Sequence, residues 1–282
     1  MGSINWRILR IPGLILLVIL LLYPYLPWEG VKTSSTEETS LSDLFQSAML
    51  HYNISTRALR GTGGYNFTSL IEDARRVAGN LSMEAAGYAG ASGGVIGKTY
   101  RASIAYMHLA NASIEFYKAS AINMEVKKHI EEVLGELRTC RVDEALASWS
   151  RIQGRVEDLI EVLEAGINES LKAEPEDLLS KEHRQLYAEG LSKAYGLLDD
   201  LRILTELMKL VEDNREELEQ ACNGENVNAS KLAGGLNGLV KKLYQGRGGE
   251  YSYDLYSTIN GMLAKLQDTQ NTSTGTSGSG TL

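Results

Sequence analysis

The sequence predicts an all-α fold, an elongated antiparallel helical bundle with coiled-coil-like seams that is preceded by an N-terminal transmembrane or signal helix. Three observations lead to this prediction. Apolar residues recur at spacings of three and four along most of the chain, no segment keeps the period-2 alternation of a strand, and the 282 residues include only 4 prolines. An apolar content of 43% is enough to bury a sizeable core.

The N-terminal residues carry a targeting signal. The segment 11–28 (IPGLILLVILLLYPYLPW) contains no charged residue, and as a helix it would span ~27 Å, close to the ~30 Å hydrocarbon core of a membrane. Arg7 and Arg10 precede it, which places the N-terminus in the cytoplasm and the bulk of the chain outside. We therefore expect residues 1–28 to be a signal anchor and the protein to be a single-pass protein of the cell membrane.

Two alternatives to an uncleaved anchor stay open. A cleaved signal peptide would have the same short positive region and dense apolar run, although residues 25–30 supply no good small-residue cleavage site. The protein would then be secreted. Gly13 before Leu14 is also compatible with a pilin-type leader.

The composition divides the rest of the chain. Residues 32–42 and 269–282 are rich in Ser and Thr and cannot pack a core. We expect, after the leader, three parts: a Ser/Thr-rich linker in 29–40, an extracellular helical-bundle domain in 41–268, and a flexible Ser/Thr/Gly-rich tail in 269–282.

The bundle is expected to open with two helices. The first begins near Ser40, which stands three residues before Asp43 as in a capping box, and ends at the glycines of 61–64. The second runs into the glycine-rich stretch 87–97. The predicted core faces are Leu41, Phe45, Ala48 and Tyr52 in the first helix, and Leu70, Ala74, Val77, Leu81, Ala85 and Tyr88 in the second.

The glycine-rich stretch contains SGGVIGKT at 92–99, one residue away from a phosphate-binding P-loop. Ser92 stands where that motif needs glycine, and both flanks have a helical pattern instead of the required strand. We therefore expect no nucleotide binding. Because a glycine inside a helix costs ~1 kcal/mol relative to alanine, the turn of an αα-hairpin is favoured over a site where two helices approach closely.

Two long helices follow the glycines. The first has a stripe that shifts slightly along its length: Tyr100, Ile104, Met107, Ile114, Tyr117, Ala121 and Met124, then Ile130, Val133, Leu137 and Cys140. The second has the strongest pattern of the chain, an unbroken seam with alternating spacings of three and four. Its members are Val142, Ala145, Trp149, Ile152, Val156, Leu159 and Leu163.

Pro175 is expected to open another long helix, because proline favours the first turn. Two shorter helices, near 229–244 and 255–266, are expected to follow, with a turn at 245–250 between them. The core face of the long helix is predicted to consist of Leu197, Leu201, Leu204, Met208, Val211, Leu218 and Cys222.

The two cysteines, Cys140 and Cys222, each stand at the C-terminal end of a long helix. One intervening helix reverses the direction of the chain, so both ends lie at the same pole and, in an exported protein, predict a disulfide. The helix that ends at Cys222 is longer than its neighbour, so we expect a bend near Gly190 or Gly196. Two free buried thiols are the alternative.

Seven of the 14 asparagines head N-x-S/T sequons, whereas about two would be expected from composition. This excess predicts N-glycosylation and solvent exposure, although the asparagines could also be ordinary capping and surface residues. Asn111 presents a conflict, because the stripe around it predicts a buried position. The sequon asparagines are Asn53, Asn66, Asn80, Asn111, Asn168, Asn228 and Asn271.

No catalytic constellation is visible. The chain has no H-x-x-x-H pair and no G-x-S-x-G motif, so we expect no metal, no cofactor and no enzymatic activity. The net charge of −8 repels phosphate backbones and argues against nucleic acid as a partner. The four histidines are expected to be surface or core-edge residues: His51, His108, His129 and His183. Three tyrosines next to a turn could present an aromatic surface: Tyr251, Tyr253 and Tyr256.

In plan, with a hydrophobic N-terminal segment, an acidic ectodomain dense in sequons and a Ser/Thr-rich end, the chain resembles archaeal surface glycoproteins. The resemblance implies a structural or adhesive role. We expect an extracellular interaction protein, such as a stalk, coat or assembly subunit, that binds protein partners or itself. A ligand-binding or sensory domain that acts through a partner protein is the alternative, and a hydrolase without a recognisable motif is a third.

Overall fold

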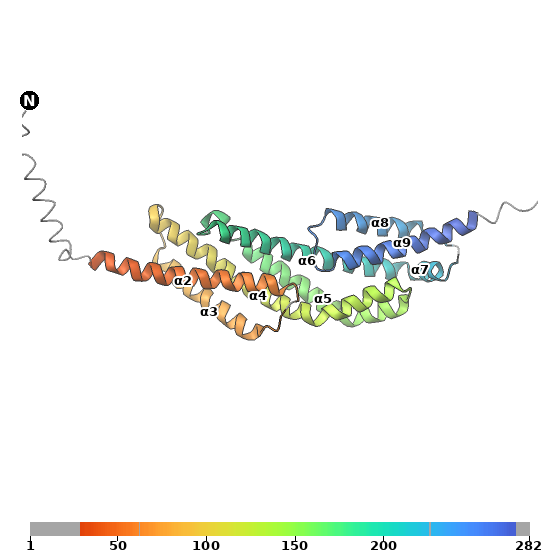
Figure 1. Cartoon of the computed structure of the whole chain (residues 1–282), viewed down its shortest axis with the longest axis horizontal. Coiled ribbons are helices and arrows are strands. Elements are labelled where there is room, and N and C mark those ends of the chain that lie inside the picture. Colours follow the sequence, from red (N-terminus) through yellow and green to blue (C-terminus); the bar gives the residue numbers. More distant parts are fainter. Residues whose placement is uncertain (1–28, 62, 226, 275–282) are drawn as a thin grey trace, which may run out of the picture. The chain divides into compact units, whose positions relative to one another are not determined.

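A computed structural model of the chain describes residues 29–61, 63–225 and 227–274 (Figure 1). These residues form eight α-helices and one 3-10 helix, with no strand among them, so the all-α prediction is confirmed for this part of the chain. The chain divides into two compact units, Met1–Asp43 and Leu44–Leu282, and the helical bundle belongs to the second. The predicted membrane segment 11–28 lies outside the described residues, and no helix within them is long and apolar enough to span a membrane.

Helix α2, Glu29–Ala58, begins well before the predicted start at Ser40. The prediction was wrong because a Ser/Thr/Glu-rich composition indicates solvation, whereas the segment 31–40 has no proline or glycine to interrupt a helix. Whether residues 29–40 act as a linker stays a prediction. The core face was predicted correctly, since its four members are buried: Leu41, Phe45, Ala48 and Tyr52.

Helix α3, Phe67–Gly87, is capped by Asn66, whose side-chain oxygen accepts a hydrogen bond from the backbone N–H of Ser69 at 3.2 Å. The chain then turns, and Gly90 and Gly94 take φ values of +91° and +65°, which favour glycine. The predicted αα-hairpin turn is therefore confirmed. Four of the six residues of the predicted stripe are buried, Ala74, Val77, Leu81 and Ala85, whereas Leu70 and Tyr88 are half-buried and the buried Ala78 was not predicted.

Helix α4, Gly94–Arg138, confirms the second part of the predicted stripe, since Ile130, Val133 and Leu137 are buried, and corrects the first part. In its first half Tyr117 is buried as predicted, but Met124 is 42% exposed and the other members are half-buried. The reason is that α4 packs against α3, α5 and α9, so it has more than one buried face, and small side chains form much of these faces. The buried positions that the pattern missed include Ala102, Ala105, Tyr106, Leu109, Ala110, Ala112, Ser113 and Phe116.

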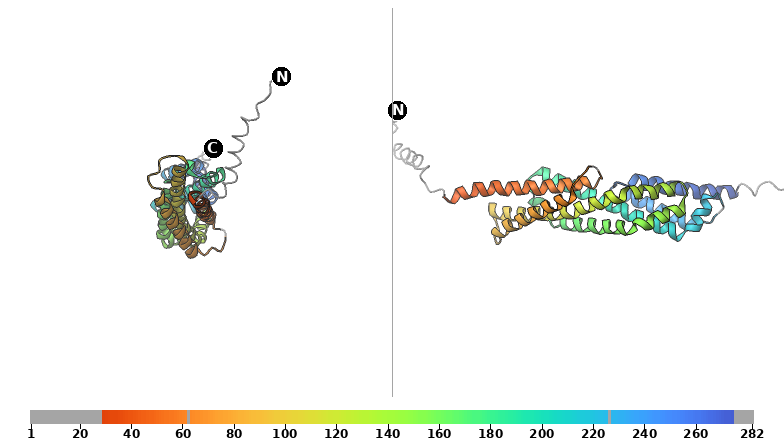
Figure 2. Two further views of the ribbon diagram at one scale, coloured as in Figure 1. Left: turned by 90° about the vertical axis from the view of Figure 1, so that its left-hand side faces the viewer. Right: turned by 90° about the horizontal axis from the view of Figure 1, so that it is seen from below.

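Helix α5, Val142–Ser170, lies beside α4, to which it is joined by a short turn (Figures 1 and 2). The two helices approach closely at Gly166, where an added Cβ would lie 2.7 Å from Cε1 of Phe116. The predicted seam is confirmed, because all seven members are buried: Val142, Ala145, Trp149, Ile152, Val156, Leu159 and Leu163.

Between α5 and Cys222 the chain forms three helical segments, where the sequence predicted one long helix. Pro175 opens the 3-10 helix η1, Pro175–Asp177, and the long helix α6, Lys181–Asp213, starts only at the N-cap Ser180. Helix α7, Arg215–Cys222, follows a break at Asn214, whose φ of −129° is not helical. The predicted core positions from Leu197 to Leu218 are nevertheless buried: Leu197, Leu201, Leu204, Met208, Val211 and Leu218.

The predicted bend near Gly190 or Gly196 is therefore wrong, because the helical path is interrupted at Asn214 instead. Both glycines lie inside α6 and allow close packing. A Cβ at Gly196 would come within 2.5 Å of the carbonyl oxygen of Gly248.

Helices α8, Ser230–Gln245, and α9, Ser252–Thr274, confirm the two predicted short helices and the turn between them. Helix α9 continues into the predicted tail through Thr274. The α8–α9 turn is fixed on α6 by the buried Asp200, which accepts hydrogen bonds from the backbone N–H of Tyr251 at 2.7 Å and from the hydroxyl of Ser252 at 2.5 Å.

Candidate functional site

A cavity of about 450 Å³ lies between the C-terminal end of α2 and the N-terminal half of α6. Three basic side chains line it, from Arg57, Arg60 and Lys193, and we call this cavity the basic cleft. Among the described residues, Glu189 is the only acidic one that lines it. Its walls consist of Asn53, Thr56, Arg57, Arg60, Tyr65, Leu186, Glu189, Gly190 and Lys193.

The cleft follows from the local geometry of two helices. Arg57 is in the last turn of α2 and Arg60 in the turn that follows, where its N–H donates to the carbonyl oxygen of Arg57 at 3.1 Å. Lys193 faces them from α6. Gly190 lets the helices approach, because a Cβ there would lie 2.7 Å from Cγ2 of Thr56.

The basic side chains of the cleft have no ion-pair partner in the part of the chain that the structure describes. Arg57 and Arg60 are exposed, and Lys193 is half-buried. Burial lowers the pKa of Lys193 below its usual value, the Arg60 and Arg57 charges lower it further, and Glu189 acts against them. Glu189 itself accepts a hydrogen bond from Nε2 of Gln185 at 2.9 Å. The cleft therefore holds an excess of positive charge in an acidic protein.

A second cavity, of about 280 Å³, is also lined by Arg60 and Lys193 and reaches the α8–α9 turn. Its acidic residue, Glu250, does not neutralise them, because its two carboxylate oxygens are taken by other partners. Nζ of Lys127 lies 2.6 Å from Oε1, and Nδ2 of Asn123 donates to Oε2 at 2.9 Å.

None of the six sequon asparagines whose side chains are described is buried. Asn66, Asn168 and Asn228 are exposed, and Asn53, Asn80 and Asn111 are half-buried. The side chain of Asn271 lies outside the described residues. At Asn111 the side-chain nitrogen, the atom that would carry a sugar, lies 3.5 Å from Oε1 of Glu169. The predicted solvent exposure is therefore found for three of the six asparagines, and glycosylation of the sequons stays a prediction.

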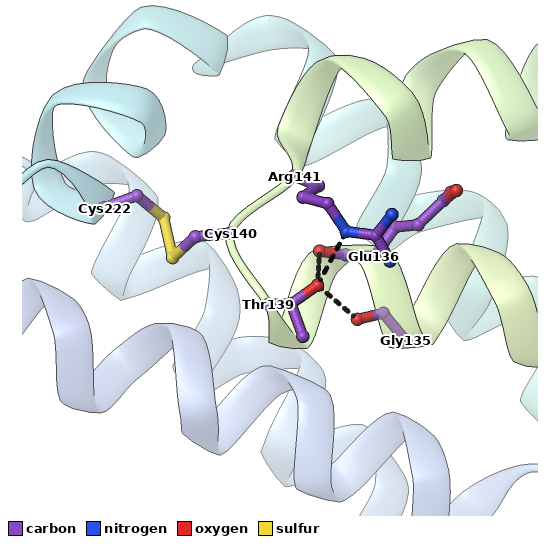
Figure 3. The surroundings of a disulfide bond; sticks show 6 residues. All are labelled: Gly135, Glu136, Thr139, Cys140, Arg141 and Cys222. Atoms are coloured by element: carbon purple, nitrogen blue, oxygen red, sulfur yellow. Dashed lines mark hydrogen bonds between the residues drawn. A yellow bond between two sulfur atoms is a disulfide. The ribbon is translucent and has the colours of Figure 1, made fainter.

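The two cysteines are joined by a disulfide, with their Cα atoms 5.7 Å apart (Figure 3). Cys140 follows the end of α4 and has a φ of +58°, in the left-handed region. Two hydrogen bonds close the helix end: the N–H of Arg141 donates to Glu136 O at 2.9 Å and the N–H of Cys140 to Leu137 O at 3.1 Å. This is a Schellman cap in which cysteine takes the place that glycine usually has.

The four histidines lie apart and make separate contacts. Nδ1 of His108 lies 2.7 Å from Oε1 of Glu169, and Nδ1 of His183 contacts the hydroxyl of Tyr106, whose pKa burial raises to about 12. His51 is buried, and His129 is exposed. No group of three potential metal ligands occurs within the described ranges.

The predicted tyrosine surface needs a correction. Tyr251 is buried, and its hydroxyl donates to Oδ1 of Asn123 at 2.8 Å, because the α8–α9 turn folds it into the core. Tyr253 is 80% exposed. Tyr256 pairs with Tyr244, whose hydroxyl donates to it at 2.8 Å. Two of the three predicted tyrosines, Tyr253 and Tyr256, are therefore exposed, and Tyr244 is exposed beside Tyr256, whereas Tyr251 is not part of this surface.

The P-loop-like segment forms the α3–α4 turn and the first residues of α4, and Lys98 is exposed there. A helix precedes it, where a P-loop would follow a strand. That the chain binds no nucleotide stays a prediction.

The sequence prediction did not find the basic cleft. Lys193 is more than a hundred positions away from Arg57 and Arg60 in the sequence, so only that pair, three residues apart at a helix end, could give a local signal. A comparison of the chain with protein-family models, curated proteins and solved structures finds no match.

Proposed function

We propose that the protein is a membrane-anchored, extracellular glycoprotein that acts through interactions, as a cell-surface stalk, coat or assembly subunit. The observation that carries this proposal is the placement of the sequons. The six asparagines with described side chains are on α2, α3, α4, α5 and two loop positions, yet none of them is in the core. A sugar already attached to any of these asparagines would therefore not have to be buried in the core of the folded bundle.

The disulfide supports the same compartment. Disulfides persist in oxidising surroundings and are rare in the cytosol. The bond between Cys140 and Cys222 therefore fits an exported domain.

The test is an intact-mass and glycopeptide analysis of the full chain purified from its native membranes. We expect a mass above the 30.9 kDa of the polypeptide and sugar on the sequon asparagines. Asn168→Gln should remove the mass of one glycan, whereas Asn237→Gln, at an exposed asparagine outside any sequon, should leave the mass of the glycans unchanged. A chain found in the cytosol without sugar would contradict the proposal.

The order of folding and glycosylation can also be tested, because the acceptor motif N-x-S/T includes the Ser or Thr as well as the Asn. A sequon whose Ser or Thr is buried is therefore not accessible in the folded chain. Ser55, Ser113 and Ser170, which belong to the sequons of Asn53, Asn111 and Asn168, are buried. We expect these three asparagines to be modified only before the bundle closes. The folded, sugar-free chain should accept glycans at Asn66, Asn80 and Asn228, whose sequon hydroxyls are exposed.

Interaction with other copies or with protein partners is the second part of the proposal. Purification in mild detergent followed by light scattering should give a mass above that of one glycosylated chain in its micelle. Compact, isolated monomers at high concentration, with no co-purifying protein, would count against a stalk, coat or assembly role.

A ligand-binding domain that acts through a partner protein is the second candidate function. The basic cleft favours it, since a cavity of about 450 Å³ is within the range of small-molecule sites, about 300–1,000 Å³. Thermal shifts against a panel of anionic and neutral metabolites test this candidate, because a specific ligand raises the melting temperature by mass action.

A further inference from the structure

We propose that the basic cleft binds a tetrahedral oxyanion, a sulfate or phosphate group, between Arg57, Arg60 and Lys193. The inference rests on the second candidate function and does not depend on the first. The cavity alone indicates a ligand of small-molecule size, whereas the three basic side chains indicate the chemical class of that ligand.

The geometry of the three side chains suits this group. Arg57 and Arg60 reach the cavity from the end of α2, and Lys193 reaches it from α6, so the cations surround one volume from two directions. A guanidinium group presents a planar fork of donors that matches two oxygens of sulfate or phosphate, and an ammonium group adds a point charge. Such a set neutralises an oxyanion on several sides at once.

The charges of the cleft are unbalanced without a ligand. Three cationic side chains face one acidic residue, Glu189, and the nearby Glu250 is engaged by Lys127. Burial lowers the pKa of Lys193, and the positive charges of Arg60 and Arg57 lower it further. A bound anion would attract the ammonium group of Lys193 and would therefore raise its pKa.

The cleft also has room for more than the anion. Its volume of about 450 Å³ exceeds what one sulfate needs, and the ring of Tyr65 lines the same space. Tyrosine offers an apolar face with a polar end, which suits the ring of a sugar. The oxyanion can therefore be a free inorganic ion or a group carried by a saccharide, and experiment can separate these two sources.

The test is calorimetric titration of the full chain with sodium sulfate, with sodium chloride of equal ionic strength as the reference. We expect sulfate to bind with heat and to raise the melting temperature, whereas chloride does neither. Arg60→Gln and Lys193→Gln should each raise Kd about tenfold, since each removes one charge-assisted contact. Lys209→Gln, an exposed lysine of α6 outside the cleft, is the matched control and should leave Kd unchanged.

A second titration distinguishes the sources of the anion. If a sulfated disaccharide binds at least tenfold tighter than inorganic sulfate, and the unsulfated disaccharide does not bind, the ligand is a sulfated saccharide. If the sulfated disaccharide and inorganic sulfate bind with equal affinity, the ligand is the free ion. Equal sulfate binding by the native chain and by the variant Arg57→Gln/Arg60→Gln/Lys193→Gln would overturn the proposal, as would no sulfate binding by the native chain. Either result leaves the glycoprotein proposal intact, because that proposal is tested by glycan mass and location.

Discussion

At the scale of single residues, Asp200 is an acid placed where its charge is unfavourable. Burial raises its pKa to about 6, although the hydrogen bonds from Ser252 and from the N–H of Tyr251 act in the opposite direction. In an unfolded chain the carboxyl has its ordinary pKa near 3.8. Between these two values the folded state holds more protons than the unfolded state. The free energy of unfolding must therefore fall as the pH rises through this window.

Asp200→Asn should remove this pH dependence. The difference in free energy of unfolding between the native chain and the variant should change by about 2 to 3 kcal/mol from pH 3.5 to pH 7.5, with the native chain losing stability toward the higher pH. Urea unfolding across that range measures it, and the other carboxyl groups cancel in the difference. If the free energy of unfolding depends on pH in the same way for the native chain and for Asp200→Asn, the pKa of Asp200 is the same in the folded and unfolded states and the prediction is wrong.

The basic cleft could not be predicted from the sequence, and its individual residues show why. Arg57, Arg60 and Lys193 are ordinary surface residues of their own helices when taken one at a time. Only the close contact at Gly190 brings α2 and α6 near enough for the three charges to share a cavity. A glycine inside a helix gives no local sign of the helix that it will meet.

At the scale of elements, helix α5 provides two glycines with opposite surroundings. A Cβ at Gly166 would collide with the ring of Phe116, whereas a Cβ at Gly154 would meet nothing within 4 Å. Gly166→Ala should therefore destabilise the bundle by about 1 to 3 kcal/mol through overpacking. Gly154→Ala should stabilise it by about 0.5 to 1 kcal/mol, since alanine loses less backbone entropy in a helix.

Chemical unfolding of both variants checks this pair. Adding Phe116→Leu to Gly166→Ala should recover part of the lost stability, because the collision is with the aromatic ring. Equal stability of the two single variants would mean that α4 and α5 do not approach at Gly166.

Helices α4 and α5 also show what the sequence can predict. The seam of α5 is made of large apolar side chains on one face, so its periodicity was decisive. Helix α4 contacts several neighbours, partly through Ala and Ser, so no single stripe describes it. The break at Asn214 was missed for a different reason: no proline or glycine marks it, and the side chain of Asn214 caps the helix end through a 2.7 Å hydrogen bond to Leu210 O.

At the scale of the whole bundle, the disulfide links two positions separated by 82 residues. In the chain-entropy model a loop of that length contributes about 4.5 kcal/mol. Cys140→Ser/Cys222→Ser should lower the melting temperature by a corresponding amount. Cys140→Gly/Cys222→Ser should be the more stable of the two variants by about 1 kcal/mol, because glycine takes the left-handed conformation without strain.

Calorimetric melting of the native chain and the two variants measures both effects. The serine variant separates the loss of the bond from the strain at the helix cap, since it keeps a Cβ at position 140. If the glycine variant is no more stable than the serine variant, the cap does not strain a residue with a Cβ.

The same bond has a mechanical consequence when the two ends of the chain are pulled apart. Tension applied to the two chain ends cannot extend the segment from Cys140 to Cys222, because the covalent link carries the force past it. In a pulling experiment with optical tweezers, the fully stretched oxidised chain should be shorter than the reduced one by about 270–300 Å, the contour of 82 extended residues. Helices α5, α6 and α7 would thus be shielded from a pull that unravels the rest.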